Sequence, residues 1–378
     1  MEDTVTVVES TDVSLYQKFL PADAAVQFLG PTGQPVPSTA RYARPDGQRL
    51  VAMYRNMVLG RRFDEQAAAL TKQGRLAVYP SSRGQEACQI AAAMCLRAED
   101  WLFPTYRDSM ALSARGIDPV DILRSLAGDW HCCFDPAQHH TAPQSTPLAT
   151  QLLHAAGLAH AQARKATGAA VLALCGDGAT SEGDFHEALN FAAVFRAPVI
   201  FLVQNNGFAI SVPLARQSVA PSLAHKGVGY GIGSEQVDGN DPVAMLAVMN
   251  EAREYVLNGN GPVIVEAHTY RVSGHTNADD PRRYRTDDEV TEWLARDPIR
   301  RLEIYLRAEG LIDDSYAAAV ASEAEDLATT IRDGMNRDRP VEIDDLFRYV
   351  YAEPTPSLRE QQQQARADFT AELTEDRQ

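Results

Sequence analysis

The chain has 378 residues, 45% of them hydrophobic, which is enough for a sizeable core and fits one large α/β domain with terminal extensions as well as it fits two domains. Its formal net charge of −16 argues against nucleic acids and anionic membranes as partners, and no apolar run approaches the roughly 20 residues that span a bilayer. Five cysteines without a C-x-x-C pair argue against a disulfide framework, and the start lacks a basic or arginine-rich presequence, so we expect a cytoplasmic protein.

Turn signals without a sustained hydrophobic period predict that residues 1–45 form an extended arm. Apolar residues at helical spacing then predict a long amphipathic helix over residues 48–73, which Gly74 ends. A second, alanine-rich helix is expected after Gly84 and extends through Met94.

A short apolar run at residues 101–103 predicts a strand whose end places Tyr106 and Arg107 at the rim of a sheet. By itself, an arginine at such a place suggests only a surface ion pair. Residues 128–147 then form a loop that contains two adjacent cysteines and three histidines, at His131, Cys132, Cys133, His139 and His140. Adjacent cysteines lack the usual spacing of zinc ligands, so a loop near the entrance of a site is the preferred interpretation over a zinc site.

Two short apolar runs flank a helical segment at the centre of the chain. The runs cover residues 171–175 and 199–203, and the helical pattern between them extends through Phe195. Fully apolar strands around a helix are typical of a parallel βαβ unit that is buried on both faces. The carboxyl ends of such strands share one edge, so we expect Asp177 and Asn206, which follow the two runs, to lie close together.

The residues around Asp177 predict a seat for a metal ion and a diphosphate. Carboxylate and amide oxygens are ligands that Mg²⁺ accepts, and Gly176 and Gly178 allow a diphosphate to approach the backbone. A helix that begins near Ser181 or Glu182 would direct its N–H groups to the same place. A dinucleotide-binding loop and a purely structural turn remain as alternatives, although the third glycine of the dinucleotide fingerprint is absent and no acidic residue for a ribose ends the second strand.

In the second half of the chain, the glycine-rich residues 227–233 fit no phosphate-loop spacing and are interpreted as irregular backbone. A helix is expected over residues 242–257, followed by a buried strand over residues 263–267. The exit of that strand carries His275. A histidine just past the rim of a sheet is a candidate proton donor or phosphate ligand, although in isolation it is more often a solvated residue.

Beyond residue 288 the pattern is helical, and it includes one amphipathic helix over residues 313–335. A last short helix is expected near residues 346–351. The charged, glutamine-rich tail from Pro354 is predicted to be frayed or to act as a contact arm.

Two long motifs carry a family resemblance. They are Gly-Asp-Gly-Ala-Thr-Ser-Glu-Gly-Asp-Phe-His at residues 176–186 and Gln-Asn-Asn-Gly-Phe-Ala-Ile-Ser at residues 204–211. With them the chain resembles the α subunit of the first component, E1, of the 2-oxo acid dehydrogenases, which are thiamine-diphosphate enzymes. The resemblance covers about residues 45–350.

The resemblance implies an α/β thiamine-diphosphate-binding fold with three layers, in which helices flank a mostly parallel sheet. The expected division is an N-terminal arm over residues 1–45, the dehydrogenase E1 α domain over residues 46–350 and a C-terminal tail over residues 351–378, with the C-terminal segment helical.

The resemblance also implies roles for individual residues. Mg²⁺ would be held by Asp177, Asn206 and the backbone carbonyl of Phe208, and His275 would serve both phosphate binding and catalysis. The other cofactor-binding positions would be Tyr106, Arg107, Thr146, Leu148, Gly178 and Ala179. The potassium ligands of branched-chain members match Ser145, Pro147, Thr150 and Gln151.

This chain departs from the family at two positions. Some members have an arginine where this chain has Gln204, and some are phosphorylated on a serine where this chain has Thr276.

By the same resemblance, the assembled enzyme decarboxylates a 2-oxo acid on thiamine diphosphate and passes the acyl group to the lipoyl group of an E2 acyltransferase. The chain contains one Gly-Asp-Gly half and no second half, so an E1 β subunit is expected as the partner in an α₂β₂ heterotetramer. The segments around residues 103–107 and 147–151 favour a branched-chain substrate, with pyruvate second. The alternative from another class is a non-catalytic dinucleotide-binding protein.

Overall fold

A five-stranded parallel sheet lies at the centre of the computed structural model, which describes residues 20–37, 41–128, 132–337 and 342–375. The strand order is β1-β2-β3-β7-β6. The strands are β1 Trp101–Phe103, β2 Val171–Gly176, β3 Val199–Asn205, β6 Gly233–Asp238 and β7 Val263–His268. Because β2 and β3 are parallel neighbours, the predicted βαβ unit is confirmed.

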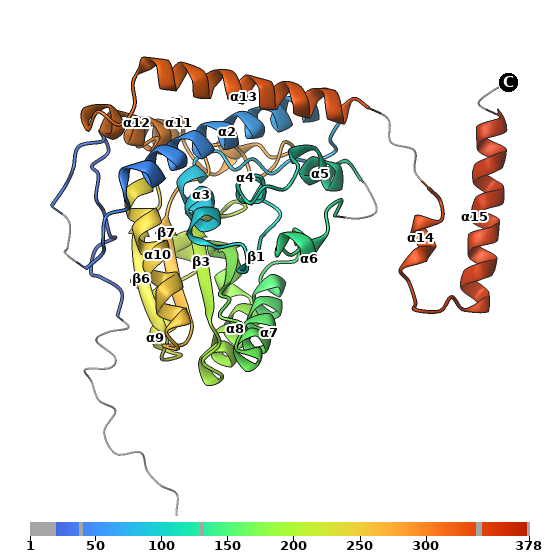
Figure 1. Ribbon diagram of the computed structural model, residues 1–378, viewed down its shortest axis with the longest axis horizontal. Coiled ribbons are helices and arrows are strands. Elements are labelled where there is room, and N and C mark those ends of the chain that lie inside the picture. Colours follow the sequence, from blue (N-terminus) through green and yellow to red (C-terminus); the bar gives the residue numbers. More distant parts are fainter. Residues whose placement is uncertain (1–19, 38–40, 129–131, 338–341, 376–378) are drawn as a thin grey trace, which may run out of the picture.

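Helices cover both faces of this sheet, so the fold has the expected layers (Figure 1). On one face α3 and α10 pack on the strands, with the long α2 beside them, and on the other face lie α7 and α8. Their bounds are α2 Gly47–Lys72, α3 Glu86–Cys95, α7 Thr150–Lys165, α8 Gly183–Val194 and α10 Pro242–Leu257.

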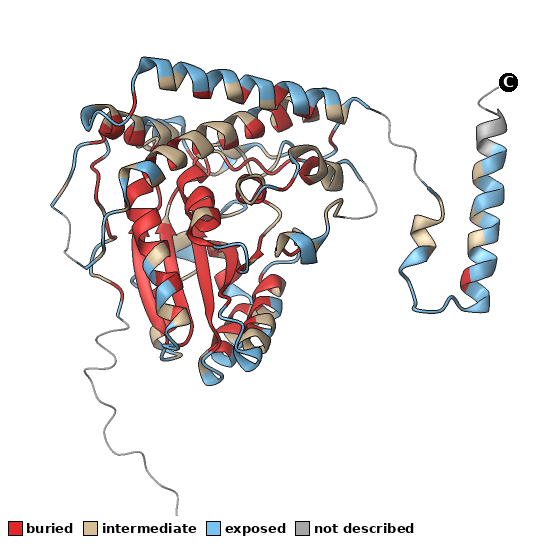
Figure 2. Cartoon of the chain, in the orientation of Figure 1, coloured by how far each residue is buried: buried red, intermediate tan, exposed pale blue. Residues whose placement is uncertain are grey.

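Successive residues of each strand point into the two different cores. Leu172 and Ile200 belong to the core formed with α3 and α10, whereas Val171 and Phe201 belong to the core formed with α7 and α8. Figure 2 shows the strands buried along almost their whole length. Burial on both faces explains why these strands are continuous apolar runs in the sequence.

The remaining helices and strands connect or cover these layers. The helix α13 runs along α2, as Figure 1 shows, and its bounds agree with the amphipathic helix predicted over residues 313–335. The other elements are α4 Ser109–Ala114, α5 Pro119–Arg124, α6 Pro136–His139, β4 Phe208–Ala209, β5 Val212–Pro213, α9 His225–Val228, α11 Asp287–Leu294, α12 Pro298–Ala308, α13 Asp314–Met335, α14 Asp345–Arg348 and α15 Pro356–Glu375; short 3₁₀ turns include η2 Asp177–Ser181.

The sheet edge at β6 was not predicted, because its sequence is mostly polar. The described part of the N-terminal arm covers this edge: the N–H of Val26 donates to Gln236 (2.8 Å) and the N–H of Asp238 donates to Val26 (3.0 Å). Within the glycine-rich residues 227–233, the stretch 229–232 between α9 and β6 is irregular, as expected. The described part of the arm therefore lies on its own domain and forms hydrogen bonds with the backbone of the edge strand β6.

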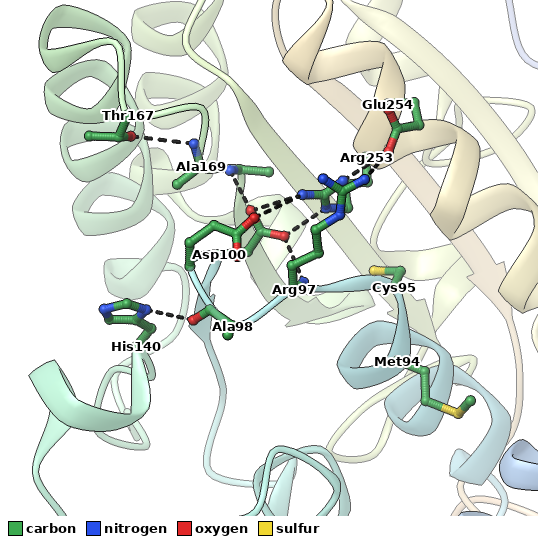
Figure 3. Close-up of polar contacts among 12 residues, drawn as sticks. Met94, Cys95, Arg97, Ala98, Asp100, His140, Thr167, Ala169, Arg253 and Glu254 are labelled. Atoms are coloured by element: carbon green, nitrogen blue, oxygen red, sulfur yellow. Dashed lines mark hydrogen bonds and ion pairs between the residues drawn. The ribbon is translucent and has the colours of Figure 1, made fainter. Parts of the chain in front are cut away.

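A buried ion pair fixes the start of the sheet (Figure 3). Asp100, just before β1, accepts hydrogen bonds from Arg253 Nε of α10 (2.6 Å) and from the N–H of Ala170, just before β2 (2.8 Å). It also accepts from the N–H of Arg97 (2.8 Å). One carboxylate thus joins two neighbouring strands to the helix layer.

The C-terminal tail is helical where a frayed segment was one of the two expectations. In α15, Arg366 pairs with Asp344, which lies next to α14, at 2.6 Å. The two helices lie to one side of the α/β domain in Figure 1. None of the described helices is both long and apolar enough to cross a membrane.

Candidate active site

The ends of β2 and β3 bring the two predicted metal ligands to one edge of the sheet. The strands are in register, with Gly176 opposite Gln204, so Asp177 and Asn206 follow on neighbouring strands. Both side chains are buried, with exposed fractions of 1% and 6%. The sequence prediction that these residues approach each other is confirmed by this register.

One carboxylate oxygen of Asp177 accepts a hydrogen bond, and the other accepts none from the described residues. Its Oδ2 accepts a hydrogen bond from Gln217 Nε2 (2.8 Å), whereas its Oδ1 is buried and has no hydrogen-bond partner among the described residues. Burial raises the pKa of this carboxyl above its usual range, and the hydrogen bond from Gln217 opposes this shift. A buried carboxylate oxygen without a donor is a site where a bound cation would be favourable.

Asn206 and Phe208 are held by the turn after β3. Asn206 Oδ1 accepts from the N–H of Phe208 (3.2 Å), and its Nδ2 donates to Gln85 (3.3 Å). Between them Gly207 has a φ of +84°, which favours glycine. The ring of Phe208 packs 5.4 Å from that of Tyr284, which anchors the turn.

The glycine after Asp177 makes room for this same turn. A Cβ on Gly178 would lie 2.7 Å from Cβ of Ala209, in β4, which is closer than two carbon atoms approach. The close contact brings the turn at the end of β3 over the segment that follows β2. Packing against Ala209 therefore requires a glycine at position 178.

One cavity contains almost all the predicted site residues. It is lined by Tyr106, Arg107, Leu148, Asp177, Gly178, Ala179, Asn206, Phe208 and His275, and also by Gln85, Thr105, Ser145, Pro147, Ala149, Gln151, Gly176, Glu182, Gln204, Ala209, Ile210 and Arg271. Thr146 is the exception: it is exposed and does not line the cavity, although Ser145 and Pro147 on either side do.

Two buried guanidinium groups converge on His275. Arg107 NH2 lies 3.1 Å from His275 Nδ1 and also donates to the backbone carbonyl of His275 (3.0 Å), and Arg271 NH1 lies 3.3 Å from the same ring nitrogen. Neither arginine forms an ion pair with a carboxylate within the described parts of the chain. The cavity therefore carries two positive charges that are suited to binding an anion.

This arrangement determines the protonation of His275. Burial, Arg107 and Arg271 together lower the pKa of the imidazole to about 4, so it is neutral near pH 7. Because both arginines approach Nδ1 as donors, Nδ1 must accept and the proton must be on Nε2.

The loop that carries His275 is tied down by buried contacts. The N–H of His275 donates to Asp279 (2.7 Å), which also accepts from the hydroxyl of Tyr284. Arg285 donates to the backbone carbonyls of Arg271, Val272 and Ser273. These contacts hold the backbone of the loop and thereby position the imidazole of His275.

The segment matched to potassium ligands forms hydrogen bonds within itself and with β2 and α8. Ser145 Oγ donates to the carbonyl of Pro147 (3.3 Å), and Thr150 Oγ1 donates to Asp184 (3.4 Å). Gln151 Nε2 donates to the carbonyl of Leu174 (2.8 Å), while its Oε1 is buried without a hydrogen-bond partner among the described residues.

Of the histidine and cysteine loop at residues 128–147, the structure describes all but residues 129–131. The part of the chain with described positions contains no group of three or more His, Cys, Asp or Glu side chains that could hold a metal. His131 lies outside the described residues.

Sequence reasoning missed the role of three cavity residues. Arg271 lies four residues before His275, and this spacing within a strand exit was the only available signal. Gln85 and Gln204 reach the site from segments 119 residues apart, and Gln85 Nε2 donates to Gln204 Oε1 at 2.9 Å. Only the packed fold shows that contact.

Comparisons with known proteins agree with this geometry. Residues 54–333 match the dehydrogenase E1 component family. The chain is 45% identical over 344 residues to the 3-methyl-2-oxobutanoate dehydrogenase subunit alpha of Mycobacterium tuberculosis, covering 91% of this chain and 94% of that protein. It is 37% identical over 316 residues to the pyruvate dehydrogenase E1 component subunit alpha of Acholeplasma laidlawii (83% and 92% covered) and 35% identical over 316 residues to that of Staphylococcus epidermidis (83% and 85% covered). The chain belongs to the dehydrogenase E1 component family.

Proposed function

We propose that this chain is the α subunit of a branched-chain 2-oxo acid dehydrogenase E1 component. In the assembled enzyme it would take part in oxidative decarboxylation of the 2-oxo acid and acyl transfer to the lipoyl group of an E2 acyltransferase. The single observation that carries the cofactor site in this proposal is the unpartnered Asp177 Oδ1, buried beside Asn206 in a cavity that also holds Arg107 and Arg271, and the branched-chain assignment is supported by the 45% identity to the 3-methyl-2-oxobutanoate dehydrogenase subunit alpha.

The residues present fit a metal ion and a diphosphate. Asp177 Oδ1, Asn206 Oδ1 and the backbone carbonyl of Phe208 would hold Mg²⁺, which prefers oxygen ligands and one or two carboxylates. Gly178 and Ala179 would let a diphosphate approach the backbone.

The remaining cofactor contacts would come from the rim of the cavity. Arg107 and Arg271 supply positive charge that does not depend on Gln204, where some family members have an arginine. Tyr106 and Leu148 would contact the cofactor from the rim, with Thr146 beside them.

The chain's own chemical contribution centres on His275. When bound, thiamine diphosphate supplies the electron sink that decarboxylation of a 2-oxo acid requires. His275 is neutral and has its proton on Nε2, so it can donate a hydrogen bond to an oxygen that gains negative charge, or to a phosphate.

A partner over the mouth of the cavity is part of the proposal. Leu148 and Ile210 line the cavity with exposed fractions of 43% and 56%, and Val212 near them is 43% exposed. Apolar side chains at a cavity mouth fit a covering E1 β subunit, in an α₂β₂ heterotetramer that binds E2.

A potassium ion is a further candidate ligand. The unpartnered Oε1 of Gln151, close in sequence to Ser145, Pro147 and Thr150, supports a cation there.

The dehydrogenase domain would cover residues 46–350.

The test is turnover of a panel of 2-oxo acids by the chain co-purified with its β subunit, with thiamine diphosphate, Mg²⁺ and an artificial electron acceptor. We expect branched-chain 2-oxo acids to give the highest kcat/KM. Pyruvate is the second candidate, because two of the compared relatives carry that name. Thermal stabilisation by NAD and none by thiamine diphosphate with Mg²⁺ would instead support a dinucleotide-binding protein.

A further inference from the structure

Four buried side chains form a chain of hydrogen bonds that ends at the proposed metal ligand Asn206. Gln204 Nε2 donates to Asp108 Oδ1 (2.7 Å), and Gln85 Nε2 donates to Gln204 Oε1 (2.9 Å). Asn206 Nδ2 in turn donates to Gln85 Oε1 (3.3 Å). None of the four residues is more than 6% exposed, and buried polar groups are costly to leave without a hydrogen-bond partner.

The carboxylate at one end fixes the direction of the whole chain. A carboxylate only accepts, whereas an amide has one donating and one accepting end. Asp108 Oδ2 already accepts from the N–H and the hydroxyl of Thr105, both at 2.7 Å, so Oδ1 is the oxygen left for Gln204. Gln204 must turn its NH₂ to Asp108 and its oxygen to Gln85, and Gln85 must then turn its oxygen to Asn206.

The consequence falls on the amide of Asn206. With its NH₂ committed to Gln85, its oxygen is left for the turn at Phe208 and for the cavity. A metal ion can bind an amide oxygen but not an amide NH₂.

We propose that Asp108 is a positioning residue that acts through Gln204 and Gln85 to turn the oxygen of Asn206 toward the metal. This inference rests on the proposed function, since it needs a metal at Asp177 and Asn206. It also assigns a role to Gln204. An arginine at that position only donates, so beside Gln85 it would reverse the direction of the chain, whereas glutamine both donates and accepts.

The decisive variant is Asp108→Asn. The N–H of Thr105 still needs an acceptor, so the new amide oxygen faces Thr105 and the new NH₂ faces Gln204. Gln204 and Gln85 then invert, so the NH₂ of Gln85 faces the NH₂ of Asn206. Asn206 then either turns its NH₂ toward the metal and gives up the bond from the N–H of Phe208, or keeps its oxygen there with two NH₂ groups opposed, and both outcomes weaken the metal site. Loss of a residue that orients a metal ligand typically weakens metal affinity about 10–100-fold, and we expect that loss here.

The measurement is a Mg²⁺ titration of the αβ assembly at fixed thiamine diphosphate, with cofactor binding followed by calorimetry. Gln204→Lys gives an independent inversion, because an ammonium group only donates to both neighbours. Gln204→Met is the matched control: it breaks the chain without reversing it, so a smaller loss is expected than for the lysine variant.

A double exchange supplies the rescue. In Asp108→Asn combined with Gln204→Glu, the carboxylate moves to position 204, where it accepts both from the new amide NH₂ at position 108 and from Gln85. The direction at Gln85 and Asn206 is restored, so most of the lost Mg²⁺ affinity should return. A merely structural hydrogen bond would not be rescued by moving its charge.

Two results would overturn the inference. One is wild-type Mg²⁺ affinity in a folded and assembled Asp108→Asn or Gln204→Lys variant. The other is a double variant that binds Mg²⁺ no better than Asp108→Asn. If the unaltered assembly itself fails to bind thiamine diphosphate with Mg²⁺, the proposed function fails instead, and the two failures are thereby distinguished.

Discussion

At the scale of single residues, the candidate site depends on a few groups whose charge or protonation is determined by burial. Asp177 has an open carboxylate oxygen, and two arginines without carboxylate partners among the described residues face a neutral His275. The negative centre suits a cation and the positive side suits an anion. A metal diphosphate satisfies both requirements at once.

The variant Asp177→Ala should abolish Mg²⁺-dependent binding of thiamine diphosphate while the fold stays intact. Asp177 is the only anionic ligand in the proposed metal set, and Mg²⁺ sites depend on such carboxylates. Calorimetric titration of the αβ assembly would measure the loss. Asp177→Asn keeps the shape and one oxygen, so we expect it to bind more weakly than the wild type but more tightly than the alanine variant. Cofactor affinity unchanged in both variants would exclude Asp177 from the site.

His275 should give the protein a distinct dependence of stability on pH. Its pKa in the folded chain is about 4, below the ordinary value of 6.5, so between these values the unfolded chain binds more protons than the folded one. This contribution to the free energy of unfolding is therefore complete above pH 6.5 and is lost as the pH falls toward 4. Urea unfolding at several pH values should show that His275→Gln removes this component. An identical pH profile in the variant would contradict the assignment.

The same variant should lose about 10²-fold in acyl-transfer rate at saturating cofactor, because a hydrogen bond to developing charge contributes on that order. The His275→Gln variant should still form an assembly with the β subunit of the same size as the wild type.

At the scale of elements, the sequence was informative where one kind of interaction decides the structure. β2, β3 and β7 are buried on both faces, so their apolar runs were sufficient to predict them. β6 is polar in sequence and owes its place to pairing with β7 and with the arm at Val26, which are distant in sequence. The tail helix α15 was likewise obscured by its low hydrophobicity.

The residues of the candidate site also form two groups, those that the sequence predicts and those that only the fold brings together. Asp177, Gly178 and Asn206 belong to compact motifs, so their neighbourhood follows from the order of the chain. Arg271 and the hydrogen-bonded set from Asp108 to Gln85 depend on side-chain packing between distant segments. No periodicity or spacing in the sequence reports such contacts.

The buried pair of Asp100 and Arg253 gives a prediction at this scale. Asp100→Ala should lower the free energy of unfolding by about 1–3 kcal/mol, because the buried donors Arg253 Nε and the N–H of Ala170 lose their acceptor while Arg253 keeps its ion pair with Glu254. Urea unfolding of the chain would measure this change. Arg97→Ala is the control: its side chain is 63% exposed, and the contact with Asp100 uses only its backbone N–H. Equal effects of the two substitutions would argue against Asp100 as the anchor of β1.

At the scale of the whole molecule, the open side of the cavity is the feature that needs a partner. The mouth carries exposed Leu148 and Ile210, whereas the strands themselves are buried under the helices of the same chain. The net charge of −16 does not favour nucleic acid as the partner. The cytoplasmic location stays a prediction.

We therefore predict that this chain alone is inactive in decarboxylation of 2-oxo acids and requires a separate β subunit. The cofactor carries the reaction and the protein tunes it, and the resemblance implies that a glutamate at the pyrimidine ring is needed in addition to the diphosphate site. The cavity would hold the diphosphate end of the cofactor, and its only glutamate among the described residues, Glu182, lies at the start of α8 beside the Gly-Asp-Gly motif. The resemblance to E1 α subunits places the missing glutamate on the β chain, so that the cofactor would lie across the interface.

The measurement is decarboxylation with an artificial electron acceptor, first with the purified chain and then after addition of the β subunit. Replacing Ile210, which is 56% exposed at the cavity mouth, by aspartate should weaken assembly without unfolding the chain, whereas the same change at Val194, 68% exposed at the end of α8, serves as the control. Full activity from a preparation that mass spectrometry shows to contain a single polypeptide would refute the prediction.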